Sequence, residues 1–212
     1  MATLVIGDIH GRLDRLEALF DGLPYWPDRF IFLGDYVDRG PDTPGVINRL
    51  LRLAQEEECV FVRGNHEDLA LDALEGSGRY PIGMWEANGG VQTIQSYPPA
   101  RDRNSWRTKL PPEHARFLRE TLLYHETAEH VFVHARINDQ GPARTPPEVL
   151  LWSRIESPFV TIGYGKRVIC GHTPFPEPMI GPDWINLDTG CGKWHGAVLS
   201  ALLLPEGRFL WG

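Results

Sequence analysis

The chain has 212 residues, enough for one domain with a substantial core, and its 42% hydrophobic and 23% charged residues are ordinary for a globular protein. Its net charge of −7 argues against an extended nucleic-acid or anionic-membrane surface, and no apolar run approaches the ~20 residues that span a bilayer. The cysteines are widely spaced, and the first residues lack the basic start and apolar core of a secretory signal, so we expect a cytoplasmic protein.

The first third of the chain alternates apolar runs with helical patterns. Leu13, Leu16 and Leu19 recur every three residues, which is a helical period. The expected strands and helices cover, in chain order, residues 4–6, 12–23, 30–33, 44–55, 60–62 and 66–74. This alternation predicts parallel strands with helices on their faces.

The order then breaks at residues 76–112, which are rich in proline and glycine but too apolar for a linker. We interpret this segment as an inserted cap that is partly helical over 84–97. A helix is expected over 111–125, and a helical turn over 147–154. Further strands are expected at 131–133, 168–170, 184–187 and 197–204. The last two are close in sequence, which favours an antiparallel pair.

Five apolar runs end in a polar cluster. They read "TLVIGDIHG", "RFIFLGDYVDRG", "CVFVRGNHE", "HVFVHAR" and "RVICGHTP". Parallel α/β sheets place ligand sites beyond the carboxyl ends of their strands, so neighbouring strands would bring the clusters to one rim. The converging side chains are Asp8, His10, Asp35, Asp38, Arg39, Arg63, Asn65, His66, His134 and His172.

Oxygen ligands mixed with imidazole suit manganese, iron or zinc. Two metal ions about 3.5–4 Å apart would use this set better than one. Taken singly, Asp8 or Asp35 is equally well explained by a turn or a cap, and His134 or His172 by a structural role. Five such clusters at strand ends make a purely structural explanation improbable. Cys191 lacks an evident base and is interpreted as a packing residue.

The motifs "GDIHG", "GDYVDRG", "RGNHE", the later strand-end histidine and "GHTP" resemble those of the PPP-type metallophosphatases, in the calcineurin-like superfamily. That group contains serine/threonine protein phosphatases, small bacterial and phage phosphatases, and symmetrical dinucleoside tetraphosphatases. The resemblance implies a mixed α/β fold with a central β-sandwich of mixed sheets flanked by helices. Residues 1–212 would form a single domain, with 76–112 as its small cap.

The resemblance also implies roles for individual residues. Asp8 and His10 would hold the first metal ion, and Asp35 would bridge both. The second ion would be held by Asn65, His134 and His172. The phosphate oxygens would be bound by Arg39, Arg63 and the Arg154 of "LLWSR". His66, oriented by Asp38, would protonate the leaving group.

The expected reaction is direct hydrolysis by a hydroxide that bridges two divalent ions, with manganese favoured over iron or zinc. The substrate is expected to be a phosphomonoester, most plausibly phosphorylated Ser, Thr or Tyr in a protein or peptide, because only one modest insertion walls the site. Arg136 departs from the small residue common at its position, and it would add positive charge or narrow the groove.

Four alternatives remain open at this point. The first is a symmetrical dinucleoside tetraphosphatase, in which Trp85, Trp106 and Tyr97 would stack on a base. The plainer interpretation of these aromatic residues is a small core of the inserted segment. A nuclease and a cyclic-nucleotide phosphodiesterase are further enzymatic alternatives, and a metal-free scaffold of the same fold is a non-enzymatic one.

Overall fold

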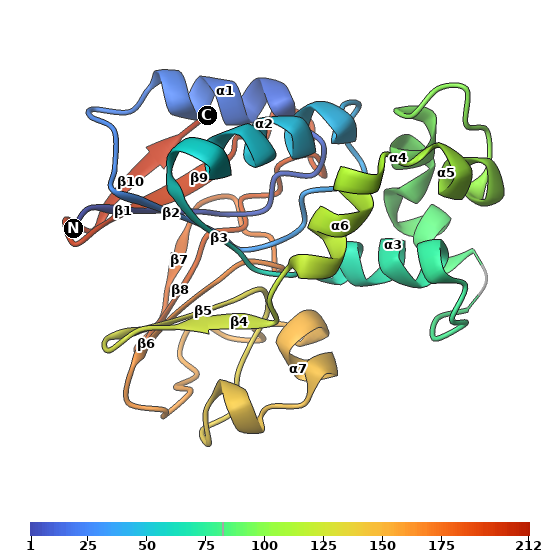
Figure 1. Ribbon diagram of the computed structural model, residues 1–212. Helices are drawn as coiled ribbons and strands as arrows, with labels where there is room; N and C mark the ends of the chain where they lie inside the picture. The colour runs from blue at the N-terminus through green and yellow to red at the C-terminus, as the bar shows by residue number, and fades with distance from the viewer. Residues whose placement is uncertain (82) are drawn as a thin grey trace.

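The computed structural model describes residues 1–81 and 83–212, and its strands form two five-stranded mixed sheets (Figure 1). The first sheet has the order β10-β9-β1-β2-β3, and the second β4-β5-β6-β8-β7. The first is built from β1 (Thr3–Ile6), β2 (Arg29–Phe32), β3 (Glu58–Phe61), β9 (Ser200–Leu204) and β10 (Arg208–Trp211). The second is built from β4 (Tyr124–Glu126), β5 (His130–Val133), β6 (Arg167–Cys170), β7 (Met179–Ile180) and β8 (Trp184–Asn186).

The two sheets stack into a sandwich because their strands are apolar on both faces. Side chains alternate along a strand, so Leu4 and Ile6 face one side of the first sheet and Val5 faces the other. The outer side packs under helices α1 (Leu13–Asp21) and α2 (Thr43–Glu56), which lie over this sheet in Figure 1. The inner side meets the second sheet in a core that includes Phe132 and Ile169. The expected β-sandwich flanked by helices is therefore confirmed.

The remaining helices lie beside and below the sandwich (Figure 1). They are α3 (Asn65–Glu75), the π-helical turn Glu86–Gly90, α4 (Val91–Gln95), α5 (Arg103–Lys109), α6 (Pro112–Glu120), the 3₁₀ turn Pro142–Arg144 and α7 (Pro147–Trp152). Helicity within 84–97 matches the expectation, whereas α5 was not predicted. Trp85, Trp106 and Tyr97 are buried, as the plainer interpretation expected, but they belong to the main core cluster with Leu4 and Phe30 and do not form a separate small core of the segment.

Two expectations about secondary structure were wrong. The helix expected over 111–125 ends at Glu120, and residues 124–126 form β4 instead. Backbone hydrogen bonds to the sheets outcompete helix extension there, since Leu122 N–H donates to the Phe61 carbonyl and β4 pairs with β5. The strands at 184–187 and 197–204 do not pair with each other. β8 pairs with β6, and β9 runs antiparallel to β1, so sequence proximity did not predict the partner.

The strands that carry the polar clusters are parallel within each sheet. β1, β2 and β3 pair in parallel, as do β5, β6 and β8, so the carboxyl ends of each set lie on one edge. Among residues 1–81 and 83–212, no helix has the length and apolar character needed to cross a membrane.

Candidate active site

The loops that follow the strands hold unusual backbone conformations at the predicted site. Positive φ angles occur at His10 (49°), Asp35 (53°), Asp38 (72°), Arg39 (65°) and His172 (65°), and at no other non-glycine residue of the described chain. Such angles are costly for side chains with a Cβ, and they persist only where the surroundings enforce them. Because all five are predicted site residues, the fold concentrates its backbone strain at this one place.

Tight packing around the carboxylates explains two of the motif glycines. A Cβ on Gly64 would lie 2.0 Å from Asp35 Oδ1, and one on Gly171 would lie 2.2 Å from Asp8 Oδ1. The buried carboxylate of Glu67 holds the neighbouring loop, because it accepts hydrogen bonds from the backbone N–H groups of Asp35 (2.7 Å), Tyr36 (2.8 Å) and Gly64 (2.9 Å). The absence of a Cβ at Gly64 and the hydrogen bonds accepted by Glu67 together fix where the Asp35 side chain points.

The first group of possible metal ligands consists of His10, Asp35 and His66. The His10 ring donates through Nδ1 to the Val37 carbonyl at 2.9 Å, and its Nε2 lies 3.3 Å from Asp35 Oδ2. Burial, and next the nearby Arg39 charge, lower the pKa of His10 to about 3, so this ring is neutral. Its inward nitrogen is therefore a lone pair, as a metal ligand requires.

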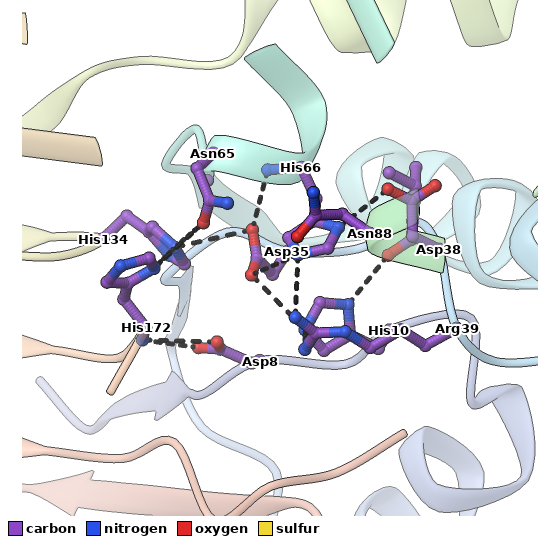
Figure 2. A network of polar contacts seen from close by, with 12 residues as sticks. Asp8, His10, Asp35, Asp38, Arg39, Asn65, His66, Asn88, His134 and His172 are labelled. Atoms are coloured by element: carbon purple, nitrogen blue, oxygen red, sulfur yellow. Dashed lines mark hydrogen bonds and ion pairs between the residues drawn. The ribbon is translucent and has the colours of Figure 1, made fainter. Parts of the chain in front are cut away.

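The second group consists of Asp35, His134 and His172 (Figure 2). His134 Nδ1 donates to the Leu33 carbonyl at 2.9 Å, and His172 Nε2 donates to the Trp152 carbonyl at 3.1 Å. Their other nitrogens face each other at 3.2 Å, and the Asn65 side-chain oxygen lies 3.0 Å and 2.9 Å from them. Burial lowers the pKa of both rings, that of His172 to about 3.

This second group fits a cation. A backbone carbonyl only accepts hydrogen bonds, so the outward nitrogen of each neutral ring carries the proton. The inward nitrogens of His134 and His172 are then both lone pairs, directed at one another and at the oxygen of Asn65. Three acceptors facing one point are stabilised by a positive ion and by little else. The mixed oxygen and nitrogen donors match the expected manganese, iron or zinc.

Two further buried carboxylates lie beside these groups. Asp8 accepts the backbone N–H of His172 at 3.2 Å, and its carboxylate belongs to neither group of three. Burial, and then the charges of Asp188 and Asp35, raise the pKa of Asp8 well above its usual range. Burial likewise raises the pKa of Asp188 to about 6. Crowded buried carboxylates such as these call for positive charge nearby.

His66 and Asp38 form a buried pair beside the ligand groups. His66 Nδ1 lies 2.7 Å from Asp38 Oδ2, and the other ring nitrogen lies 2.9 Å from an Arg39 nitrogen. Burial lowers the pKa of His66, but the Asp35 charge and the hydrogen bond to Asp38 outweigh it and raise the pKa overall. Arg39 also contacts His10, so its guanidinium sits among the imidazoles.

An open groove of about 430 Å³ lies next to Arg39, and its lining includes Asn88, Gln92, Arg154 and Lys193. Burial, and then the Arg39 and Arg154 charges, lower the pKa of Lys193, as expected where cations gather. Salt bridges to Arg39, Arg154 or Lys193 are absent among residues 1–81 and 83–212. The groove therefore presents basic groups that are not held in ion pairs within the described residues, although Asp8 and Asp188 lie near enough to attract Lys193.

Two predicted arginines lie elsewhere. Arg63 donates to the Thr121 hydroxyl at 3.0 Å and to the Arg119 carbonyl at 3.0 Å, on the side of the chain where α6 ends. It does not share the polar network of Arg39 in this structure. Arg136 lines a small cavity with Ile155 and Trp184, and it is not among the residues that line the groove.

Sequence reasoning missed several residues that the structure brings to the site. Asp188 follows β8 in the same way that the predicted residues follow their strands, so the pattern of an apolar run and a polar cluster in "WINLDTG" was a usable signal. Glu67 was present in the quoted motif "RGNHE". Trp85 and Thr93 carried no such signal, because nothing in the sequence indicates which part of 76–112 faces Asp38.

The chain is similar to known phosphoesterases in sequence and in fold. The sequence model of the family described as calcineurin-like phosphoesterase matches residues 1–209. A bis(5'-nucleosyl)-tetraphosphatase PrpE of Oceanobacillus iheyensis, designated asymmetrical, is 28% identical over 97% of this chain and 90% of its own. Serine/threonine-protein phosphatase 1 of Salmonella typhimurium is 30% identical over 88% of this chain and 85% of its own. A crystal structure described provisionally as a diadenosine tetraphosphatase matches with a TM-score of 0.72 at 21% identity, covering 100% of this chain and 92% of its own.

Proposed function

The chain belongs to the calcineurin-like phosphoesterase family, and from this premise we propose that it hydrolyses phosphomonoesters on phosphorylated proteins or peptides. The proposed ligands of two divalent ions, most plausibly manganese, are Asp8, His10, Asp35, Asn65, His134 and His172. When bound, such ions supply activation of water for attack on phosphorus and positive charge for the phosphoryl oxygens. The orientation of the inward lone pairs around Asp35 supports this ligand set.

The proposed general acid is His66. Asp38 accepts the Nδ1 proton at 2.7 Å, so the ring presents its Nε2 toward Arg39, where the ester oxygen would lie. In the structure Nε2 faces an Arg39 N–H, which only donates, so Nε2 accepts in this contact. As the general acid the ring would carry a proton on Nε2, which its raised pKa favours, and would give that proton to the leaving oxygen. The pairing of His66 with Asp38, next to an arginine and the ligand groups, is the observation that carries the proposed function.

We assign phosphate binding to the groove cations Arg39 and Arg154, with Lys193 as an additional cation. None of the three forms an ion pair within the described residues, so each can pair with an arriving phosphate dianion. A phosphate-binding role for Arg63 stays a prediction. Its guanidinium donates to Thr121 and Arg119 in this structure, and it would have to leave both before it reached a phosphate.

The openness of the groove supports a protein or peptide substrate. Trp85, Trp106 and Tyr97 are buried, so they are not available to stack on a base as the dinucleotide alternative required. The residues that line the groove are polar, basic or small. A phosphorylated side chain on an extended peptide can enter such a groove without a dedicated base pocket.

A second candidate is hydrolysis of a dinucleoside polyphosphate. It is supported by the names of the relative from Oceanobacillus iheyensis and of the matching crystal structure. Trp194, which is 39% exposed and follows Lys193, is an aromatic surface on which a base could stack. That relative is designated asymmetrical, whereas the sequence had suggested a symmetrical cut.

The deciding experiment compares kcat/KM for a phosphopeptide and for diadenosine tetraphosphate, with the same metal and salt. We expect the phosphopeptide to be preferred. A preference of ~100-fold for the dinucleotide, about 2.7 kcal/mol in the transition state, would overturn this choice in favour of the second candidate. The nucleotide products would then distinguish a symmetrical from an asymmetrical cut. An Asp35→Asn preparation purified in parallel measures contaminating phosphatase.

A further inference from the structure

The 76–112 segment contacts the Asp38 carboxylate directly. The Trp85 indole N–H lies 3.0 Å from both Asp38 oxygens, and the Thr93 hydroxyl lies 2.7 Å from Oδ1. His66 Nδ1 lies 2.7 Å from Oδ2. Each Asp38 carboxylate oxygen thus has two hydrogen-bond partners. The Trp85 indole N–H contacts both oxygens, which fixes the plane of the carboxylate as well as its position.

The hydroxyl protons around Thr93 can be assigned from these contacts. The Asp38 backbone N–H donates to the Thr93 oxygen at 2.8 Å, so the single hydroxyl proton of Thr93 is free to go to Asp38 Oδ1. The Thr43 hydroxyl, 3.1 Å from the Thr93 oxygen, must then be the donor of that contact. Thr43 donates to Thr93 and Thr93 donates to Asp38 Oδ1, while Asp38 Oδ2 accepts from His66 Nδ1.

Burial makes these contacts strong. Asp38 and Thr43 are 0% exposed, Thr93 1% and Trp85 2%, so water does not replace a lost donor. A buried carboxylate that loses a donor turns toward those it keeps, and this change alters how it holds His66. The segment also accepts the Arg39 backbone N–H at the Gly89 carbonyl, 3.1 Å away.

We propose that Trp85 and Thr93 are positioning residues that fix the Asp38 carboxylate and thereby direct His66 Nε2 at the leaving oxygen. This inference rests on the proposed role of His66 as the general acid. Neither residue touches substrate. The 76–112 segment is therefore part of the proton-donating apparatus and not merely a wall of the groove.

The chain offers a matched control for Trp85. Trp106 packs against it, with ring centroids 4.6 Å apart, and is 0% exposed. Its indole nitrogen has no hydrogen-bond partner within the part of the chain that the structure describes. Trp85→Phe and Trp106→Phe each remove a buried indole from the same core cluster, but only the first removes a donor to Asp38.

The test is steady-state kinetics of the metal-loaded protein on an alkyl phosphate and on p-nitrophenyl phosphate, whose leaving group needs little protonation. General acid catalysis contributes roughly 10²–10⁴-fold, so we expect Trp85→Phe and Thr93→Val to lower kcat on the alkyl phosphate about tenfold, with KM little changed. Their effect on p-nitrophenyl phosphate should be about twofold or less. Thr93→Ser, which keeps the hydroxyl, should restore kcat, and Trp106→Phe should affect both substrates equally.

His66→Ala in the same panel separates the two proposals. Equal losses on both substrates for His66→Ala would mean that His66 is not the acid, and the proposed function would need revision. A selective loss for His66→Ala combined with equal losses for Trp85→Phe and Thr93→Val would overturn the positioning inference alone. If Trp85→Phe fails to fold, the Thr93→Val and Thr93→Ser pair decides the matter by itself.

Discussion

The strand-end loops and the 76–112 segment reach the same acid by different means. The loops place Asp38 and several of the proposed metal ligands through backbone conformation, and five of their residues have positive φ angles, while His66 stands in the first turn of α3. The segment contributes through buried side chains, since Trp85 and Thr93 contact Asp38 from helical turns. The loops determine which chemistry is possible, and the segment determines how well one group is held.

This contrast predicts the order in which substitutions matter. Residues of the loops would touch the metal ions or the phosphate, so their removal deletes a chemical function. Residues of the segment act through Asp38, so their removal leaves every reacting group present but less well oriented.

The largest expected effect belongs to Asp35→Asn. Asp35 lies between both ligand groups, with Oδ2 3.3 Å from His10 and Oδ1 3.4 Å from His134. Removing its negative charge there should lower kcat by roughly 10³-fold or more, since removal of a single preorganised electrostatic contact already costs 10²–10³-fold. The fold should remain, as judged by circular dichroism. Asp139→Asn, at an exposed carboxylate, is the control, and full activity of Asp35→Asn would exclude a bridging role.

The groove cations should have a smaller effect. Arg154→Ala and Lys193→Ala each remove one charge from an open cluster of cations, so kcat/KM should fall by roughly 10-fold for each. The loss should diminish as salt is added, because exposed charges are screened. Lys109→Ala, at an exposed lysine of α5, should leave kcat/KM unchanged. An equal loss in Lys109→Ala would point to general surface charge instead of the groove.

The smallest expected effect is on the stability of the fold and not on catalysis. His114 on α6 is buried between the Tyr97 hydroxyl at 2.8 Å and the Asn48 side-chain oxygen at 3.0 Å, and burial lowers its pKa. The unfolded chain therefore binds the proton more readily, so the free energy of unfolding should fall as pH drops from about 6.5 toward the folded-state pKa.

Urea denaturation at several pH values tests this prediction. His114→Gln should make the dependence of unfolding free energy on pH shallower below about 6.5, with His10 and His172 supplying the remaining slope. His195→Gln, at an exposed histidine, is the control and should not reproduce this change. If the His114→Gln variant kept the wild-type slope, the pH dependence of the unfolding free energy would come from other groups.

The sequence predicted much of the site because its signals are local. An apolar run followed by Asp, Asn or His marks a strand end, and five such runs led to the proposed ligands, of which the structure gathers Asp35, His134 and His172 with the oxygen of Asn65. The β-sandwich followed from the family resemblance and is confirmed.

What the sequence did not predict depends on contacts between distant segments. Helix 111–125 was too long because the pairing of Leu122 with Phe61 is a tertiary event. β9 could not be assigned to β1 from its proximity to β8. The contact of Trp85 with Asp38 spans 47 residues and carries no periodicity, so only a three-dimensional structure reveals it. Arg63 matched its motif, yet its contacts with Thr121 depend on where α6 ends.

The most direct test of the proposed two-metal site is turnover of chelator-treated protein as manganese is added back, with bound metal counted on the same samples. The lone pairs of His10, His134 and His172 and the buried carboxylates around them predict no turnover without metal. Activity should return as bound manganese rises to two ions per chain. Full turnover in metal-free protein, or full recovery at one ion per chain, would contradict the account.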